Sequence, residues 1–239
     1  MGASGFNLSE RQAGWPPGWT VEYVDETGST NDDVLATADR RPDRSVLAAG
    51  HQTAGRGRLD RRWDAPPGAN LLVSLLFHDV PAEPGELTRR VGLATVAACC
   101  RLAGAEATLK WPNDVLLGDA KVAGILAQRS PAGAVAVGLG LNVGWAPDGA
   151  ARLGDGIEPL DALRAVLQAY DGLPDDVMSM YRDALSTLGR RVRVQQLDGV
   201  TVGVATDVEP DGRLVIVDAC ALTHRFHAGD VVHVRSDDP

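Results

Sequence analysis

The sequence of 239 residues has few cysteines and no long apolar run. Its three cysteines, Cys99, Cys100 and Cys220, are too few for a disulfide framework, which excludes the class of small disulfide-stabilised secreted domains. No stretch approaches the ~18 apolar residues that a membrane-spanning helix needs, and the N-terminus lacks the basic and apolar regions of a signal peptide. We therefore expect a cytoplasmic protein that does not enter a membrane.

Positive charge is also scarce, because 32 acidic residues outnumber 23 basic residues and the formal net charge is −9. The field of such a protein repels a polyanion, and no basic run outside residues 56–62 offers a nucleic-acid face. The cysteines and histidines do not have the spacing of a zinc site. A phosphate-bearing ligand must therefore be held by a few local side chains.

The composition changes twice along the chain. Residues 1–19 are rich in Gly, Ser and Pro, which predicts a flexible leader with no room for a DNA-binding module. Residues 189–239 contain five short strand patterns separated by Asp-Gly, Pro-Asp-Gly and Ala-Gly-Asp turns, which predicts a small β-barrel. Between them, residues 20–188 are long enough for one main domain with a sizeable core.

Hydrophobic periodicity predicts the secondary structure of both parts. We expect strands in the main domain over residues 20–25, 46–50, 70–77, 115–117, 122–128 and 135–143. We expect helices over residues 31–38, 86–102, 159–170 and 174–188, the last two being either separate or one helix interrupted at residues 172–174. The barrel strands are expected over residues 191–196, 200–209, 213–217, 221–228 and 231–235.

Lysine occurs only twice, as Lys110 and Lys121, whereas every other basic residue is arginine. A compact ammonium suits a position where a point charge must hold a carboxylate or a phosphate oxygen. Pro112 favours an extended conformation at the preceding residue, so residues 110–114 are expected to leave a strand as a turn.

The two short strands that follow this turn are joined by a polar turn at residues 118–120, which predicts a hairpin. The hairpin brings Asn113, Asp114 and Lys121 within reach of one another. An ordinary hairpin with a solvated lysine and aspartate explains the spacing about equally well.

Residues 51–63 form a glycine-rich loop with four arginines and too few apolar residues to pack by themselves. Glycines let a backbone approach a ligand closely, and arginines offer forked donors to carboxylate or phosphate. A solvated basic loop and an RNA-contacting segment are the alternatives. The loop matches neither the phosphate-cradling P-loop pattern nor a dinucleotide-binding glycine turn.

Two smaller patterns also indicate a binding site. Ser29, Thr30 and Asn31 place hydroxyls and an amide at a helix start, where free backbone N–H groups point outward, although helix capping alone explains one of them. Gly138 and Gly140 lie on one face of a strand and leave a slot. Such glycines mark close approach of a ligand about as often as a bulge or tight packing.

Together, these patterns resemble the biotin protein ligases in sequence order over residues 21–235. The matching stretches are residues 29–31, 52–63, 70, 110–114, 121–126 and 138–142. The most specific is Lys-Trp-Pro-Asn-Asp with a second lysine soon after it and Gly-Arg-Gly-Arg before it. The resemblance implies an α+β fold, in which a class II synthetase-like catalytic domain with a mixed sheet precedes an SH3-like barrel. The barrel agrees with the one predicted from the turns.

The resemblance also implies a two-step reaction. The carboxylate of biotin attacks the α-phosphate of ATP, with Mg²⁺ present, and the products are biotinyl-5'-AMP and pyrophosphate. A lysine of a biotin carboxyl carrier domain, such as that of an acyl-CoA carboxylase, then attacks the acyl phosphate. Members of the family that repress transcription carry an N-terminal winged helix, so no DNA binding is expected here. Monomer and homodimer both occur among biotin ligases, and both are left open.

The matching motif positions imply the site residues. Lys121 and Arg58 are the implied catalytic residues, and Asp114 is the implied magnesium ligand. The residues implied to bind biotin are Ser29, Thr30, Asn31, Gln52, Gly55, Arg56, Gly57, Arg58, Lys121, Gly124, Gly138 and Gly140. The residues implied to bind ATP or the adenylate are Arg58, Arg61, Trp63, Lys110, Asn113 and Asn142.

The sequence departs from the family pattern beside the loop. Asp60 stands where many relatives have glycine, and Asp64 and Ala65 stand where a small hydroxyl residue is usual, so loop closure is expected to differ in detail. A lipoate ligase would share the fold, but the loop and residues 110–114 resemble biotin enzymes more closely. A nucleic-acid-binding protein is disfavoured by the acidic net charge and by a barrel whose single aromatic residue is Phe226.

Overall fold

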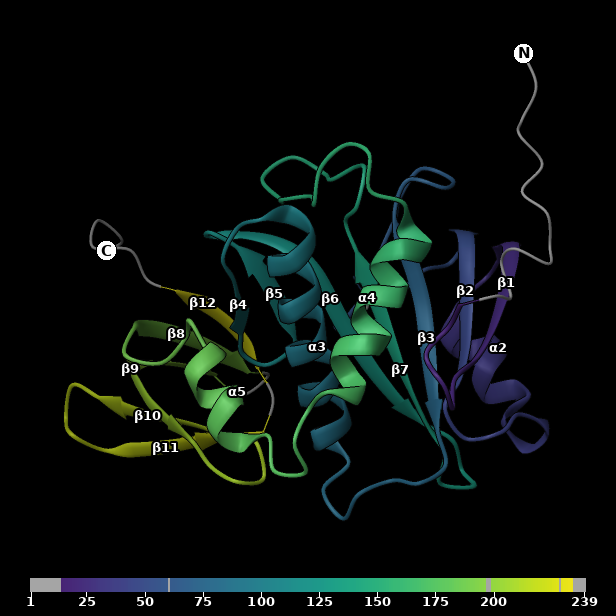
Figure 1. Cartoon of the computed structure of the whole chain (residues 1–239). Coiled ribbons are helices and arrows are strands. Elements are labelled where there is room, and N and C mark those ends of the chain that lie inside the picture. The colour runs from purple at the N-terminus through teal and green to yellow at the C-terminus, as the bar shows by residue number, and fades with distance from the viewer. Residues whose placement is uncertain (1–13, 60, 197–198, 228, 234–239) are drawn as a thin grey trace.

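Two β-sheets organise the chain in the computed structural model, which describes residues 14–59, 61–196, 199–227 and 229–233 (Figure 1). The larger sheet has seven strands in the order β1-β2-β3-β7-β6-β5-β4, and the smaller has five in the order β11-β10-β9-β8-β12. The larger sheet consists of β1 (Thr20–Thr27), β2 (Ser45–Gln52), β3 (Leu71–Phe77), β4 (Ala107–Lys110), β5 (Asp114–Leu117), β6 (Ala120–Arg129) and β7 (Val135–Leu141).

The larger sheet is mixed, because β1 pairs with β2 in parallel and every other neighbour pair is antiparallel. Its central strands β3 and β7 are buried on both faces, which explains their nearly continuous apolar sequences. The hairpin predicted around residues 118–120 is confirmed as β5 and β6. The motif at 110–114 joins β5 to the edge strand β4, so it stands near one edge of the sheet.

Helices cover the two faces of this sheet. α3 (Gly85–Ala103) and α4 (Pro159–Asp171) lie side by side over one face (Figure 1). α2 (Thr30–Ala36) lies over the other face, where Val34 packs against Leu47, Leu76 and Ala136. A short 3₁₀ helix, Ala38–Arg40, follows α2. Among the described residues, no helix combines the length and apolarity required to cross a bilayer.

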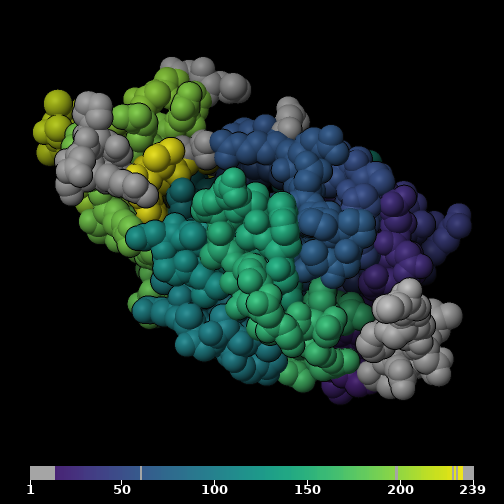
Figure 2. Space-filling model, turned by 90° about the horizontal axis from the view of Figure 1, so that it is seen from above, coloured from purple at the N-terminus to yellow at the C-terminus, as the bar shows by residue number. Residues whose placement is uncertain are grey.

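The smaller sheet follows α5 (Met178–Ala184) and is entirely antiparallel. Its strands are β8 (Arg191–Gln196), β9 (Gly199–Val208), β10 (Leu214–Asp218), β11 (Thr223–Phe226) and β12 (Asp230–His233). Each predicted barrel strand corresponds to one of these, although residues 197, 198, 228, 234 and 235 lie outside the described part. Figure 2 shows the yellow residues of β12 against the teal and blue surface of the larger unit.

Two expectations from the sequence are wrong. The helix expected over residues 174–188 is reduced to Met178–Ala184, because Leu185 leaves the helix to form a parallel bridge with Leu109 at the edge of the larger sheet. The leader expected over residues 1–19 includes Trp19, which is buried and donates from its indole nitrogen to Asp171. The first difference comes from contacts of Leu185 with the sheet edge, and the second from contacts of Trp19 with α4. Residues 1–13 of the expected leader lie outside the described residues.

Candidate active site

A cavity of about 260 Å³ opens where the larger sheet, the loop after β2 and strand β12 meet. Of the site residues expected from the sequence, all except Gly55 line it. They are Ser29, Thr30, Asn31, Gln52, Arg56, Gly57, Arg58, Arg61, Trp63, Lys110, Asn113, Asp114, Lys121, Gly124, Gly138, Gly140 and Asn142. The fold thus brings four separate sequence motifs to one cavity. Local structure alone does not place them together, because they are far apart in the sequence.

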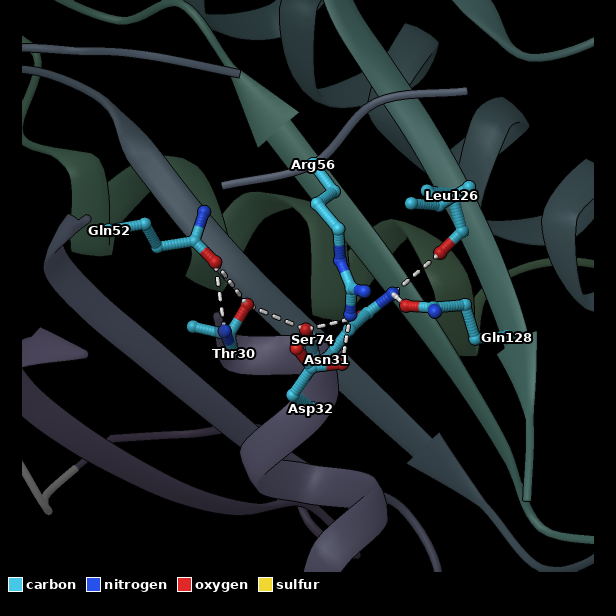
Figure 3. A network of polar contacts seen from close by, with 8 residues as sticks. All are labelled: Thr30, Asn31, Asp32, Gln52, Arg56, Ser74, Leu126 and Gln128. Carbon is cyan, nitrogen blue, oxygen red and sulfur yellow. Dashed lines mark hydrogen bonds and ion pairs between the residues drawn. The ribbon is translucent and has the colours of Figure 1, made fainter. Parts of the chain in front are cut away.

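One end of the cavity is a network of hydroxyl and amide groups at the start of α2, next to the ion pair of Arg56 and Asp32 (Figure 3). The backbone N–H of Thr30 donates to Oε1 of Gln52 at 2.8 Å, so Gln52 satisfies a free N–H of the helix start. The hydroxyl oxygen of Ser74 lies 2.7 Å from Oγ1 of Thr30 and 2.6 Å from Oδ1 of Asn31. This end offers hydroxyl and amide groups that both donate and accept hydrogen bonds.

Asn31 links this network to strand β6 (Figure 3). Its Nδ2 donates to the Leu126 carbonyl at 3.1 Å and to Oε1 of Gln128 at 2.7 Å. A Cβ atom on Gly138 would lie 2.7 Å from Oδ1 of Asn31. The slot expected at Gly138 therefore accommodates the Asn31 side chain.

Trp63 occupies the slot beside the other two glycines. A Cβ atom on Gly140 would lie 2.3 Å from Cε2 of Trp63, and one on Gly124 would lie 3.0 Å from Cζ3. The Nε1 atom of Trp63 is buried and has no hydrogen-bond partner among the described residues. Trp63 thus lies inside the glycine-lined channel, so a ligand that fills this channel must displace the indole.

The glycine-rich loop folds back on itself in front of the cavity. The Trp63 N–H donates to the Gly55 carbonyl at 3.0 Å, and the Gly57 N–H donates to the Arg61 carbonyl. A Cβ atom on Gly55 would lie 2.3 Å from the Trp63 carbonyl oxygen, so this glycine permits close backbone packing. Gly55 supports the loop and does not line the cavity. Arg56 pairs with Asp32 at the first turn of α2.

Arg58 reaches from this loop across the cavity. Its Nη1 donates to Oδ1 of Asn113 at 3.0 Å, and its Nη2 donates to the Gly229 carbonyl at 3.4 Å. Asn113 in turn donates from Nδ2 to the Ile125 carbonyl at 2.7 Å, which fixes its amide. Arg58 therefore joins the loop, the turn before β5 and the smaller sheet.

Lys121 and Asp114 form an ion pair across the hairpin. The Lys121 Nζ lies 2.6 Å from Oδ1 of Asp114 and 5.5 Å from the centre of the Trp63 ring system. Asp114 is a single carboxylate, and no group of three or more His, Cys, Asp or Glu side chains in the described part of the chain is placed to hold a metal ion. This site has no protein cage for a cation.

Asn142 is a buried residue of the cavity wall, where it organises the loop after β7. Its Nδ2 donates to the Ala151 carbonyl at 3.0 Å, and its backbone carbonyl accepts from the Leu153 N–H at 3.0 Å. The Asn70 amide lies against it, with Nδ2 at 3.3 Å from Oδ1 of Asn142. These bonds indicate that Asn142 shapes the cavity wall next to the loop after β7.

Several residues of the wall or the polar network were not found from the sequence, among them Ser74, Gln128 and Val231. Ser74 is fully buried in an otherwise apolar strand, and that single polar residue was a signal that could have identified it. Gln128 and Val231 line the cavity from β6 and β12. Val231 could not be found by periodicity, because its position depends on how the smaller sheet packs against the larger one.

Comparison with known proteins relates this geometry to a family. Residues 23–144 match the model of the biotin/lipoate A/B protein ligase family, and residues 187–234 match the biotin protein ligase C terminal domain. The chain is 38% identical to a biotin--[acetyl-CoA-carboxylase] ligase of Mycobacterium tuberculosis, over 96% of this chain and 95% of that protein. The chain belongs to the biotin protein ligase family.

Other members and solved structures agree with this assignment. The ligase is 27% identical over 81% of its length to the bifunctional ligase/repressor BirA of Bacillus subtilis, covering 68% of that protein. Its fold is similar to that of a biotin protein ligase from Aquifex aeolicus in complex with biotin and ATP, with a TM-score of 0.79 at 24% identity over 91% of this chain and 99% of that chain. The expected fold class is confirmed: an α+β catalytic unit with a mixed sheet and a C-terminal SH3-like unit.

Proposed function

We propose that this ligase activates biotin with ATP and transfers the biotinyl group to a lysine of a carboxylase's biotin carboxyl carrier domain. In the first step, a biotin carboxylate oxygen forms a bond to the α-phosphorus of ATP while the bond to the bridging oxygen breaks and pyrophosphate leaves. In the second step, the ε-amine nitrogen of the carrier lysine attacks the acyl carbon. The bond to the phosphate oxygen breaks, AMP leaves and the nitrogen loses a proton.

The observation that carries this proposal is the polarity of the cavity. One end is a neutral network of hydroxyl and amide groups, and the other carries the ammonium of Lys121 and the guanidinium of Arg58. A ureido ring needs neutral donors and acceptors, whereas a carboxylate beside a phosphate needs cations. One cavity of this shape accommodates both ends of biotin and orients its carboxylate toward the nucleotide.

We assign the biotin-binding role to the neutral end and the channel. Thr30, Asn31 and Gln52 face the ureido ring, with Ser29 beside them, and Ser74 is added as their buried support. The remaining assigned residues are Gly55, Arg56, Gly57, Gly124, Gly138 and Gly140, in the loop and the channel wall. Trp63 leaves the channel when biotin enters and then covers the ligand.

We assign the reacting centre to Lys121 and Arg58. Lys121 holds the biotin carboxylate and an α-phosphate oxygen, so the two anions approach each other at a lower electrostatic cost. Arg58 stabilises the additional charge on the phosphate in the transition state. Arg61, Lys110 and Asn113 hold the other phosphates, and Asn142 contacts the adenylate end together with Trp63.

Magnesium fits this site as a companion of the nucleotide. Mg²⁺ is usually held by one or two carboxylates together with substrate phosphates and water, and Asp114 supplies one carboxylate. When bound, the ion neutralises phosphate charge and orients the leaving group. Asp114 also keeps Lys121 directed into the cavity through their ion pair.

The proposed organisation extends to the rest of the chain. The catalytic domain covers residues 20–188 and the SH3-like barrel covers residues 189–239. The ligase acts in the cytoplasm, where carboxylases and ATP are found. Its oligomeric state is monomer or homodimer, which sedimentation of the purified protein distinguishes.

ATP–pyrophosphate exchange tests the proposal. Purified protein with Mg²⁺ is given biotin, lipoate or no acid, and the incorporation of labelled pyrophosphate into ATP is measured. Exchange that depends on biotin alone supports the proposal, and transfer is then followed with a purified carrier domain. Exchange with lipoate alone contradicts the substrate assignment, and no exchange with either acid contradicts the activity.

A further inference from the structure

Trp111 anchors the turn between β4 and β5 by donating two hydrogen bonds to residues outside the larger sheet. Its side chain is almost fully buried, and its backbone N–H donates to Oγ1 of Thr187 at 3.0 Å. Its indole Nε1–H donates to the Gly212 carbonyl at 2.9 Å, in the turn between β9 and β10. The middle of the Lys-Trp-Pro-Asn-Asp motif is therefore held by residues close to and within the smaller sheet.

Thr187 belongs to a segment that extends the edge of the larger sheet. Leu185 forms a parallel bridge with Leu109, and the Ser186 N–H donates to the Leu109 carbonyl at 2.8 Å. Thr187 follows directly and has no exposed surface. The backbone of this segment is thus fixed beside β4, which aims the Thr187 hydroxyl at the Trp111 N–H.

The same hydroxyl reaches the last described strand of the barrel. Oγ1 of Thr187 lies 3.2 Å from Nε2 of His233. The hydroxyl has one proton and two lone pairs, so it accepts from Trp111 and either donates to Nε2 of His233 or accepts from it, according to the imidazole tautomer. Burial, together with the charges of Lys110 and Arg190 and against that of Asp119, lowers the pKa of His233 to about 4, so the ring is neutral at physiological pH.

This chain of two hydrogen bonds acts at the point where the turn faces the nucleotide. Lys110 and Asn113 flank Trp111 and its proline, and both line the cavity. Asn113 also accepts from Arg58. A displacement of Trp111 therefore moves two phosphate-facing side chains and weakens the contact of a third.

We propose that Thr187 is a positioning residue for nucleotide activation: its hydroxyl joins Trp111 to His233 and thereby holds Lys110 and Asn113 in place. This role rests on the proposed function and adds a residue outside the cavity wall to it. The hydroxyl is essential to this role and the methyl group is not. Replacing the hydroxyl leaves the Trp111 N–H buried without its partner, which the turn relieves by shifting.

The test compares T187V, which removes the hydroxyl and keeps a branched side chain, with T187S, which keeps the hydroxyl. The apparent KM for ATP is measured by biotin-dependent pyrophosphate exchange, biotin affinity is measured by calorimetry, and Tm is measured for each variant. We expect T187V to raise the KM for ATP roughly tenfold and T187S to stay within about twofold of wild type. Biotin affinity stays within about twofold of wild type in both variants. The hydroxyl and amide groups at the biotin end of the cavity make no hydrogen bond to Trp111, Thr187 or His233.

Three results overturn the role of Thr187: an unchanged KM for ATP in T187V, an equal defect in T187S, or a parallel loss of biotin affinity. If T187V does not fold, H233L decides instead, because it removes the imidazole partner of the hydroxyl while Thr187 still binds Trp111. A raised KM for ATP in H233L supports the role, and an unchanged KM overturns it. Wild-type protein without biotin-dependent exchange contradicts the proposed function itself, which separates the two failures.

Discussion

The Nζ of Lys121 lies 2.6 Å from Oδ1 of Asp114, across the hairpin that carries both residues. The ammonium is further confined by Gly124, where a Cβ atom would lie 3.1 Å from Nζ. This geometry explains why one of the two lysines in an arginine-rich chain stands here. A compact point charge fits between the carboxylate and the glycine, and a planar guanidinium does not.

We therefore expect K121R to lose adenylation although its charge is conserved. The fork of arginine cannot hold the biotin carboxylate and the α-phosphate at one point, so the rate of biotin-dependent pyrophosphate exchange should fall by about 10²-fold or more. The matched control is R129K, which replaces an arginine by a lysine at an exposed position of the same strand. Exchange by K121R at the wild-type rate would exclude the point-charge requirement.

Arg58 is expected to act on the transition state. R58A removes the guanidinium that joins Asn113 to Gly229, and removal of one such charge donor typically costs about 10²–10³ in kcat. Stopped-flow measurement of pyrophosphate release reports the first step directly. R40A, at a side chain that is 83% exposed and far from the motif, serves as the control. A normal burst of pyrophosphate from R58A would remove Arg58 from the mechanism.

Gly140 is expected to require the absence of a side chain. Strand β7 is paired on both sides at this position, with Leu72 and with Gly124, so the backbone cannot retreat from an added methyl group. That methyl group would lie 2.3 Å from Trp63 and project into the channel. We expect G140A to weaken biotin binding by at least about tenfold in calorimetry, since overpacking of this kind costs about 1–3 kcal/mol.

G172A is the control for this substitution, because its Cβ would approach no heavy atom closer than 3.6 Å at the end of α4. Equal biotin affinities of G140A and wild type would mean that the channel at Gly140 does not hold biotin.

His233, in strand β12, predicts a pH dependence of stability. The pKa of His233 is lowered from 6.5 to about 4, chiefly by burial, so between these values the unfolded chain binds a proton that the folded chain does not. The free energy of unfolding should therefore fall as the pH is lowered from 6.5 toward 4, and this contribution is constant above 6.5. Urea unfolding of wild type and H233L at pH 7 and pH 5 measures it. Wild type should lose more stability than H233L, and parallel losses would contradict the assignment.

Elements whose apolar residues repeat with a clear period were predictable from the sequence. Strand Leu71–Phe77 and helix Gly85–Ala103 lie where the apolar pattern placed them, because local periodicity reflects which faces become buried. The segment at 174–188 was not predictable. Its apolar residues suit a helix, but the pairing of Leu185 with Leu109 stabilises an extended backbone after Ala184, and that partner is distant in sequence.

The site was partly predictable for the same reason. The turn at 110–114 and the lysine at 121 are joined by one short hairpin, so their proximity follows from local structure. Ser74 and Gln128 join Asn31 only through the packing of α2 on the sheet. The position of Trp63 over Gly140 follows from how the loop folds back, which its composition does not specify.

The sequence by itself determined the chemistry of this protein: which side chains carry charge, which glycines leave room and the order in which the motifs of a biotin protein ligase occur. Only the tertiary structure decided how these groups meet. It placed Gly229, just before β12, beside Arg58, and His233 of β12 beside Thr187, at separations of 171 and 46 residues. Contacts of this range depend on the packing of whole surfaces, which summed over many side chains outweighs the preference of any short segment.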